Sequence, residues 1–120
     1  MHHKDLQVWK RSIAFVSDIY KILESFPKSE QFWLIDQIKR ASISIASNIA
    51  EWCARWTEKE QKHFLYIARG SCSEIDTQLL IAKNLGFILQ DSYNTLETEL
   101  AIIGKMLTKL IQSCDSPTSR

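Results

Sequence analysis

The ten residues from Ala41 to Ala50 carry no charge, and they constrain the fold more than any other part of the chain. The stretch from Phe64 to Ala68 is likewise apolar or aromatic at every position. A helix on the surface of a monomer shows one apolar stripe opposite a charged face. Segments that are apolar or small nearly all round must be covered from more than one side. The sequence therefore predicts helices that carry an interface, and it does not indicate a reaction.

The composition is that of an ordinary globular domain. Of the 120 residues, 45% are hydrophobic and 24% are charged. This size predicts a single domain, which we place at residues 1–114, and the turn-like composition of residues 115–120 predicts a flexible C-terminal tail. The net charge is +1, and no block of thirty residues departs from neutrality by more than one charge. The basic tail or stripe of a strong nucleic-acid binder is missing, although folding can still gather cations on one face.

No segment predicts a membrane or secreted protein. The longest apolar runs are four or five residues, whereas a membrane span needs about 18–20, and we expect no signal peptide. Cys53, Cys72 and Cys114 form no C-x-x-C pair and lie at or beside apolar helical positions. This usage is typical of buried thiols in a reducing compartment. We expect a cytoplasmic protein.

Apolar residues spaced three and four apart predict four helices, at about residues 5–25, 28–53, 57–85 and 91–113. With short connections, they predict an all-α, antiparallel up-down-up-down four-helix bundle. The expected core positions form one seam in each helix: Trp9, Ile13, Val16, Tyr20 and Leu23; Ile35, Ile38, Ser42, Ile45, Ile49 and Trp52; Phe64, Ala68, Ile75, Leu79 and Ala82; and Tyr93, Leu96, Leu100, Ile103, Leu107 and Leu110.

Several local signals mark the helix ends. Phe26 precedes a proline, which pushes it out of the helical region and ends the first helix. Thr57 to Glu60 reads as a capping box at the start of the third helix, and Gly86 as its C-terminal stop. Gly70 lies in mid-helix, where it costs up to about 1 kcal/mol relative to alanine. We interpret it as the mark of a close helix crossing.

Catalytic and metal-binding constellations are incomplete. Glu60 and His63 form one Glu-x-x-His unit of a di-iron site, but the second unit is absent from the sequence. Ser71 and Cys72 lie eight and nine residues after His63, about 12–14 Å along a helix and too far for a hydrogen bond. The three glycines are isolated, so no phosphate loop exists. We expect no metal, no cofactor and no enzymatic activity.

Polar residues interrupt the apolar stretch: Asn48, Glu51, Arg69, Ser71, Glu74 and Gln78. Buried polar groups must be paired. The favoured interpretation is structural, with Arg69 pairing with Glu51 or Glu74 and Asn48 bonding across a helix crossing or subunit contact. The alternative is a polar ligand pocket.

A second candidate surface combines cations and aromatic rings. Lys39, Arg40 and Arg55 lie on the second helix and its exit, near Trp52 and Trp56. Arginines interleaved with aromatic residues can stack nucleic-acid bases. The favoured interpretation is nevertheless a solvated charged face, with Trp52 in the core or in an interface.

Three segments together resemble one family. They are K-D-L-x-V-W at 4–9, Q-I-K-R-A-x-x-S-I-x-S-N-I-A-E at 37–51 and F-L-Y-I-A-R-G-S-x-x-E-x-x-T-Q-L at 64–79. In this order and spacing they resemble the bacterial 23S rRNA-intervening-sequence proteins, from residue 4 to about residue 111. The resemblance implies a four-helix bundle that assembles into a cyclic homopentamer. A distant relative is the accessory protein of the reverse transcriptase of diversity-generating retroelements, which is thought to bind nucleic acid.

The family pattern implies no assigned catalytic role for the residues that it marks. These are Arg40, Ser44, Ser47, Asn48, Glu51, Arg69, Gly70, Ser71, Glu74 and Gln78. The chain departs from the family where A-E-G and a glycine-containing basic turn are usual, because Trp52, Cys53 and Ala54 follow Glu51 here. The end of the second helix is therefore left open.

From the sequence we expect a non-enzymatic, ring-forming protein that resembles the 23S rRNA-intervening-sequence proteins. We expect the second and third helices to form much of the interface, with Trp52, Trp56, Phe64 and Tyr66 as anchors. One functional hypothesis is a nucleic-acid-associated accessory protein that contacts RNA, DNA or a nucleic-acid-processing protein through Lys39, Arg40 and Arg55. The alternative is a protein-interaction scaffold without affinity for nucleic acid.

Overall fold

The computed structural model describes residue 3 and residues 6–115. Of the expected tail at 115–120, only Asp115 is described, and it forms an ion pair with Lys62 of α3; residues 116–120 lie outside the described residues. The described residues contain four α-helices and no strand: α1 (Gln7–Leu23), α2 (Asp36–Ala54), α3 (Glu58–Asn84) and α4 (Gln90–Cys114). Two short helical segments, η2 (Lys28–Glu30) and η3 (Gln31–Ile35), precede α2. The prediction of an all-α protein with four helices is confirmed. No helix in this part of the chain is long and apolar enough to cross a membrane.

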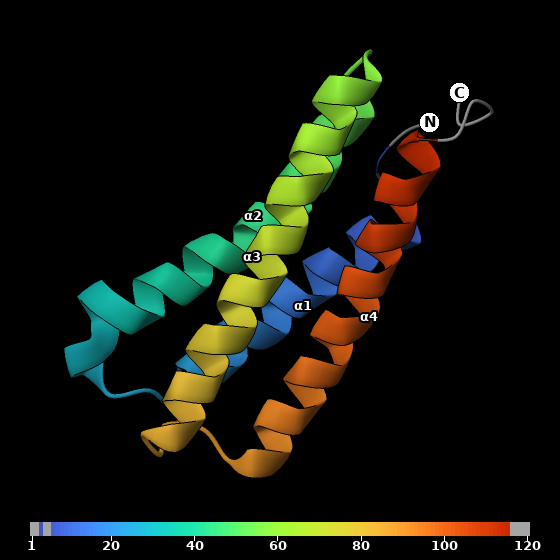
Figure 1. The fold of residues 1–120 in the computed structure, drawn as a ribbon. Coiled ribbons are helices and arrows are strands. Elements are labelled where there is room, and N and C mark those ends of the chain that lie inside the picture. Colours follow the sequence, from blue (N-terminus) through green and yellow to red (C-terminus); the bar gives the residue numbers. More distant parts are fainter. Residues whose placement is uncertain (1–2, 4–5, 116–120) are drawn as a thin grey trace.

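The four helices surround one core (Figure 1). Helix α2 packs against α1 and α3, and α4 packs against α3 and α1. The molecule measures 48 × 24 × 21 Å. Its largest fully buried side chains come from all four helices: Phe15, Ile19, Ile38, Ile45, Ile49, Leu65, Ile75, Leu79, Ile103 and Leu107. Burial of this shared apolar surface is the main source of stability.

Helix α1 buries a different stripe from the predicted one. Its buried residues are Val8, Ser12, Phe15, Ile19 and Leu23. Of the predicted seam only Leu23 belongs to this set, and Ile13 and Tyr20 are 42% and 40% exposed. The prediction was wrong because both stripes have helical spacing. The buried stripe contains the polar residue Ser12, so it looked less apolar in the sequence than the stripe that was predicted. The buried Ser12 hydroxyl donates a 2.8 Å hydrogen bond to the carbonyl of Val8, one turn earlier.

The start of the second helix is irregular. The segment after Pro27 forms a 3₁₀ turn, then a π-helical turn at Gln31–Ile35, before regular α2 begins. Phe32 and Trp33 in the π-helical turn are 83% and 71% exposed. The prediction of a single regular helix from about residue 28 was therefore wrong. Within α2, the isoleucines of the predicted seam are buried as expected.

The predicted ends of the third helix are confirmed. The Thr57 hydroxyl accepts a 3.2 Å hydrogen bond from the backbone N–H of Glu60. At the other end, Gly86 has φ +82°, and the N–H groups of Gly86 and Phe87 donate to the carbonyls of Lys83 and Ala82. This pair of bonds is a Schellman motif, which favours glycine at that position.

Candidate interaction surfaces

The three cations of the predicted nucleic-acid surface do not form one cluster. Arg40 is exposed, and the Lys39 ammonium lies 4.9 Å from the centre of the Tyr20 ring on α1. Arg55 follows the last residue of α2. Fifteen residues of helix separate Arg40 from Arg55, which is about 22 Å along the axis. Lys39 and Arg40 therefore form one candidate contact, and Arg55 lies at the far end of the same helix.

Arg55 is engaged within the chain. Its guanidinium forms an ion pair with Glu51, one turn earlier, and lies 4.9 Å from the centre of the Phe64 ring. Its carbonyl accepts a 2.9 Å hydrogen bond from the side-chain amide of Gln61. These contacts join the end of α2 to the start of α3. Arg55 thus carries a structural role at the turn where the family glycines are replaced.

A polar network connects α2 to α3 through three of the family-pattern residues. The hydroxyl oxygens of Ser44 and Ser71 are 2.9 Å apart. The Asn48 amide donates to both the hydroxyl and the carbonyl of Ser44, at 2.9 and 2.8 Å. Asn48 therefore bonds within its own helix and reaches the helix crossing only through Ser44. The network satisfies Ser71, which is 7% exposed.

Arg69 does not pair with Glu51 or Glu74, so that prediction was wrong. Its guanidinium points toward α4, where it donates a 3.4 Å hydrogen bond to the Thr108 hydroxyl, and it lies 5.0 Å from the centre of the Tyr66 ring. The sequence could not indicate Thr108 as the partner because the two residues meet only through the packing of α3 on α4. No carboxylate partner of Arg69 occurs among the described residues.

Gln78 contains a buried polar atom without a partner. Its side chain is 7% exposed, and its amide group donates a 3.4 Å hydrogen bond to Glu74. Within the described part of the chain, nothing donates to its buried carbonyl oxygen.

Gly70 is exposed on the same helix, and an added Cβ would meet nothing within 4 Å. The interpretation of Gly70 as a close crossing within the protomer was therefore wrong.

The four proposed interface aromatics differ in exposure. Trp52 packs against the core and is half-buried, as is Phe64. Tyr66 is 48% exposed and Trp56, in the turn between α2 and α3, is 89% exposed. Their role in an interface stays a prediction.

Two exposed apolar surfaces were not recognised as such from the sequence. The outer α1–α2 surface contains Ile13, Tyr20 and Ile43, each 40–44% exposed. Lys39 lies over Tyr20, so Ile43, one turn further along α2, lies on that side as well. The outer α2–α3 surface contains Ile67, Ile81 and Leu85.

These three residues of the outer α2–α3 surface are 37%, 46% and 58% exposed. Ile67 and Ile81 are fourteen residues apart and so share one stripe of α3. Ser71, one turn after Ile67, contacts Ser44 of α2. The stripe therefore flanks the side of α3 that meets α2. In Figure 1 the first half of α2 diverges from the end of α3, where Ile81 is located.

The cysteines, Ser71 and His63 were considered as catalytic residues, and their contacts are those of structural residues. Burial raises the pKa of the Cys72 thiol to about 12 and also raises the pKa of Cys53. Neither thiol is activated as a nucleophile. The Ser71 hydroxyl donates to the carbonyl of Ile67, and the His63 ring packs edge-on against Phe64. Across the described residues, no group of three or more His, Cys, Asp or Glu side chains could hold a metal ion.

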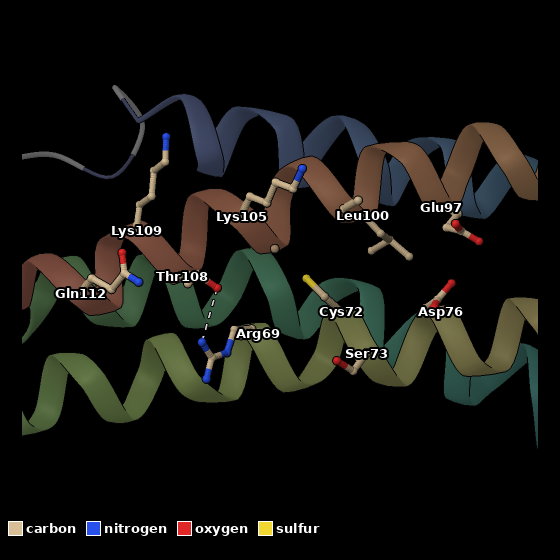
Figure 2. Close-up of a pocket in the computed structure, with 12 residues that line it drawn as sticks. Arg69, Cys72, Ser73, Asp76, Glu97, Leu100, Lys105, Thr108, Lys109 and Gln112 are labelled. Carbon is tan, nitrogen blue, oxygen red and sulfur yellow. Dashed lines mark hydrogen bonds between the residues drawn. The ribbon is translucent and has the colours of Figure 1, made fainter.

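A groove of about 700 Å³ lies between α3 and α4 (Figure 2). Arg69 and Thr108 lie near one end, with Lys105 and Lys109 on the α4 side. Asp76 and Glu97 lie at the other end. No sequence motif indicated this groove, because its cations are dispersed over forty residues.

A tyrosine contacts a carboxylate at the acidic end of the groove. The Tyr93 hydroxyl donates a 3.1 Å hydrogen bond to Asp76. Hydrogen bonding to Glu97, desolvation and the contact with Asp76 all raise the pKa of Tyr93, in that order of importance. No ion pair among the described residues joins Asp76 or Glu97 to the cations at the other end of the groove.

Comparison with known proteins identifies a family and a fold. A sequence model described as 23S rRNA-intervening sequence protein matches residues 4–109. No curated protein matches. A crystal structure from Bacteroides thetaiotaomicron, described as a protein with unknown function from the S23 ribosomal protein family, is similar with a TM-score of 0.82. The sequences are 22% identical, and the match covers 93% of this chain and 99% of the other.

Proposed function

The chain belongs to the 23S rRNA-intervening sequence protein family, and from that premise we propose that it is a non-enzymatic ring protein associated with nucleic acid. The four helices form an antiparallel up-down-up-down bundle, and the bundles assemble into a cyclic homopentamer. The proposal concerns what the exposed surfaces of this chain can bind.

The main observation in support of a ring-shaped assembly is that the protomer has two different exposed apolar surfaces. The outer α1–α2 surface and the outer α2–α3 surface flank α2 on different sides. An isologous dimer uses one self-complementary surface, whereas a heterologous contact joins two different surfaces and closes into a ring when the rotation permits. A protomer with two different apolar surfaces is compatible with a heterologous contact that closes into a ring. Each surface would then cover the other on the neighbouring subunit.

The unpartnered carbonyl oxygen of Gln78 supports a neighbour on the α2–α3 side. A buried acceptor without a donor costs about 1–3 kcal/mol. Gln78 is one turn before Ala82 and three residues before exposed Ile81. Because the oxygen is buried within the protomer, a donor from an adjacent subunit would satisfy it only after the Gln78 side chain turns outward toward Ile81. Trp52, Trp56 and Phe64 remain proposed anchors near the α2–α3 turn, and Phe64 lies fourteen residues, or about 21 Å, before Gln78 along α3. Tyr66, whose ring lies against Arg69, is not included among them.

Repetition around the ring supports nucleic-acid association despite the low net charge. Each protomer presents Lys39 and Arg40 on one part of α2. A ring displays this pair once per subunit, so weak contacts act together through multivalency. RNA, DNA or a nucleic-acid-processing protein are the proposed partners. Arg55, which pairs with Glu51, contributes less.

A specific observation also favours the alternative of a protein scaffold. Phe32 and Trp33 are adjacent in the chain and more than two-thirds exposed. Large exposed aromatic side chains are enriched at the centres of protein interfaces. A partner protein could bury both rings without any contribution from nucleic acid.

Two measurements test the proposal. Light scattering at micromolar concentration should show a pentamer, and a monomer would contradict the ring. Fluorescence anisotropy with labelled RNA and DNA should show binding that weakens steeply as salt rises, because phosphate contacts release counterions. The double variant Lys39→Ala/Arg40→Ala should bind more weakly. Absence of binding at low salt would contradict nucleic-acid association and favour the scaffold.

A further inference from the structure

The basic end of the α3–α4 groove contains three cations that lack a carboxylate partner among the described residues. Ion pairs in this part of the chain engage Arg11, Arg55 and Lys62, and none engages Arg69, Lys105 or Lys109. Lys105 and Lys109 are one turn apart on α4 and exposed. In Figure 2 Arg69 reaches toward α4 from α3, while the two lysine side chains extend from the side of α4 that faces away from α3. A concentration of one sign of charge beside a low-dielectric groove attracts the opposite charge.

The groove has a defined polarity. Glu97 precedes Lys105 by eight residues on α4, which is about 12 Å along the helix. Asp76 follows Arg69 by seven residues on α3, or about 10 Å. Between the two ends the lining is uncharged and includes Leu100, Ala101 and Gly104. A polyanion is therefore attracted at one end and repelled at the other, which restricts it to the part of the groove near the end of α4.

An aromatic ring lies beside the cations. Tyr66 is 48% exposed, and the Arg69 guanidinium lies over its ring at 5.0 Å. Single-stranded nucleic acids are recognised by a positive groove that follows the phosphates together with aromatic rings on which bases stack. The Thr108 hydroxyl and the Gln112 amide at the same end can donate hydrogen bonds to phosphate oxygens.

From this arrangement we propose that the end of the α3–α4 groove formed by Arg69, Lys105 and Lys109 binds the backbone of a single-stranded nucleic acid, with Tyr66 as a stacking platform for a base. The site is separate from Lys39 and Arg40 on α2. It rests on the proposed nucleic-acid association and specifies a surface for it. The buried, neutral Cys72 thiol places no negative charge on the groove wall to oppose the phosphates.

The test compares variants that lose equal charge from different surfaces. The assembled wild-type protein, Lys105→Ala/Lys109→Ala and the control Lys10→Ala/Lys21→Ala are titrated into a labelled oligouridine of about 12 nucleotides, within the usual site size. Lys10 and Lys21 are exposed on α1, away from the groove. Circular dichroism and light scattering establish that each variant folds and assembles like the wild type.

Each phosphate contact contributes about 0.7 to the slope of log affinity against log salt for a single strand. Loss of both lysines should therefore lower this slope by about 1.4, so that the wild type loses about seven-fold more affinity than the variant between 50 and 200 mM salt. The control should retain the wild-type slope. Tyr66→Leu should lower affinity about five-fold or more and leave the slope unchanged.

The other outcomes distinguish this site from the proposed function. Wild-type affinity and slope in Lys105→Ala/Lys109→Ala would overturn the groove site and leave nucleic-acid association intact. Absence of binding by the wild type at low salt would overturn both. Equal displacement of the RNA by polyglutamate of the same length would overturn the assignment to nucleic acid, because the groove would then bind any polyanion.

Discussion

Helices α1 and α4 show the same heptad-like spacing in sequence but bury it differently. In α4 the predicted seam is the buried stripe, from Tyr93 through Leu107. In α1 only Leu23 of the predicted seam is buried, Ile13 and Tyr20 are exposed, and the neighbouring stripe forms the core. The difference is that α1 carries two apolar stripes. A helix with one stripe has one possible orientation on a core, whereas a helix with two can bury either and present the other to a partner.

Replacement of Phe15 by alanine should have the largest effect. Phe15 is 1% exposed in the stripe that α1 buries, and truncation of such a side chain costs about 3–5 kcal/mol through lost transfer energy and the remaining cavity. Tyr20→Ala is the matched aromatic control in the other stripe and should cost much less. Denaturant unfolding measures both. A larger loss for Tyr20→Ala would mean that the predicted seam was right after all.

A matched pair on α4 should show the same contrast within a single-stripe helix. Ile103 is fully buried, and Ile103→Ala should lower the free energy of unfolding by about 2–5 kcal/mol. Ile102 is half-buried and one residue away, so Ile102→Ala should cost less. Equal losses at the two positions would contradict the burial of one stripe only. The midpoint shift in denaturant, at constant slope, is the appropriate readout.

Sequence patterns predicted much of the fold because local chemistry decided it. The cap at Thr57, the stop at Gly86 and the isoleucine seam of α2 each depend on residues within one or two turns. The choice of stripe in α1 depends on the other three helices, so periodicity alone could not settle it. The π-helical turn at Gln31–Ile35 has no comparable local signal, and it changes the phase at which α2 begins.

The candidate surfaces were less accessible from the sequence. Lys39, Arg40 and Arg55 are close in sequence, but the length of α2 separates them. Arg69, Lys105 and Lys109 are far apart in sequence, and only the packing of α3 on α4 brings them to one groove. The hydrogen bond between Ser44 and Ser71 likewise depends on how α2 meets α3, so the sequence could not indicate it.

Substitution of the outward stripe of α1 should affect assembly more than folding. Ile13→Ser removes a half-buried side chain, which costs about 1 kcal/mol of protomer stability by area. In the proposed ring it also removes an apolar contact with the neighbouring subunit. Light scattering across a dilution series should show dissociation at higher concentration than for the wild type. Lys10→Ser on the same helix is the control, and equal dissociation of both would contradict the outer α1–α2 surface as an interface.

The smallest effect on stability is expected from loss of the ion pair between Arg11 of α1 and Glu99 of α4. One guanidinium nitrogen of Arg11 donates to both carboxylate oxygens of Glu99, at 2.9 and 3.0 Å. Both side chains are partly exposed, and such pairs contribute about 0.2–1 kcal/mol because water and salt screen them. Arg11→Ala should therefore lower the free energy of unfolding by less than about 1 kcal/mol, with the difference shrinking in high salt. A salt-independent loss of several kcal/mol would instead mean that the stem of Arg11, and not its charge, holds α1 in its observed orientation against α4.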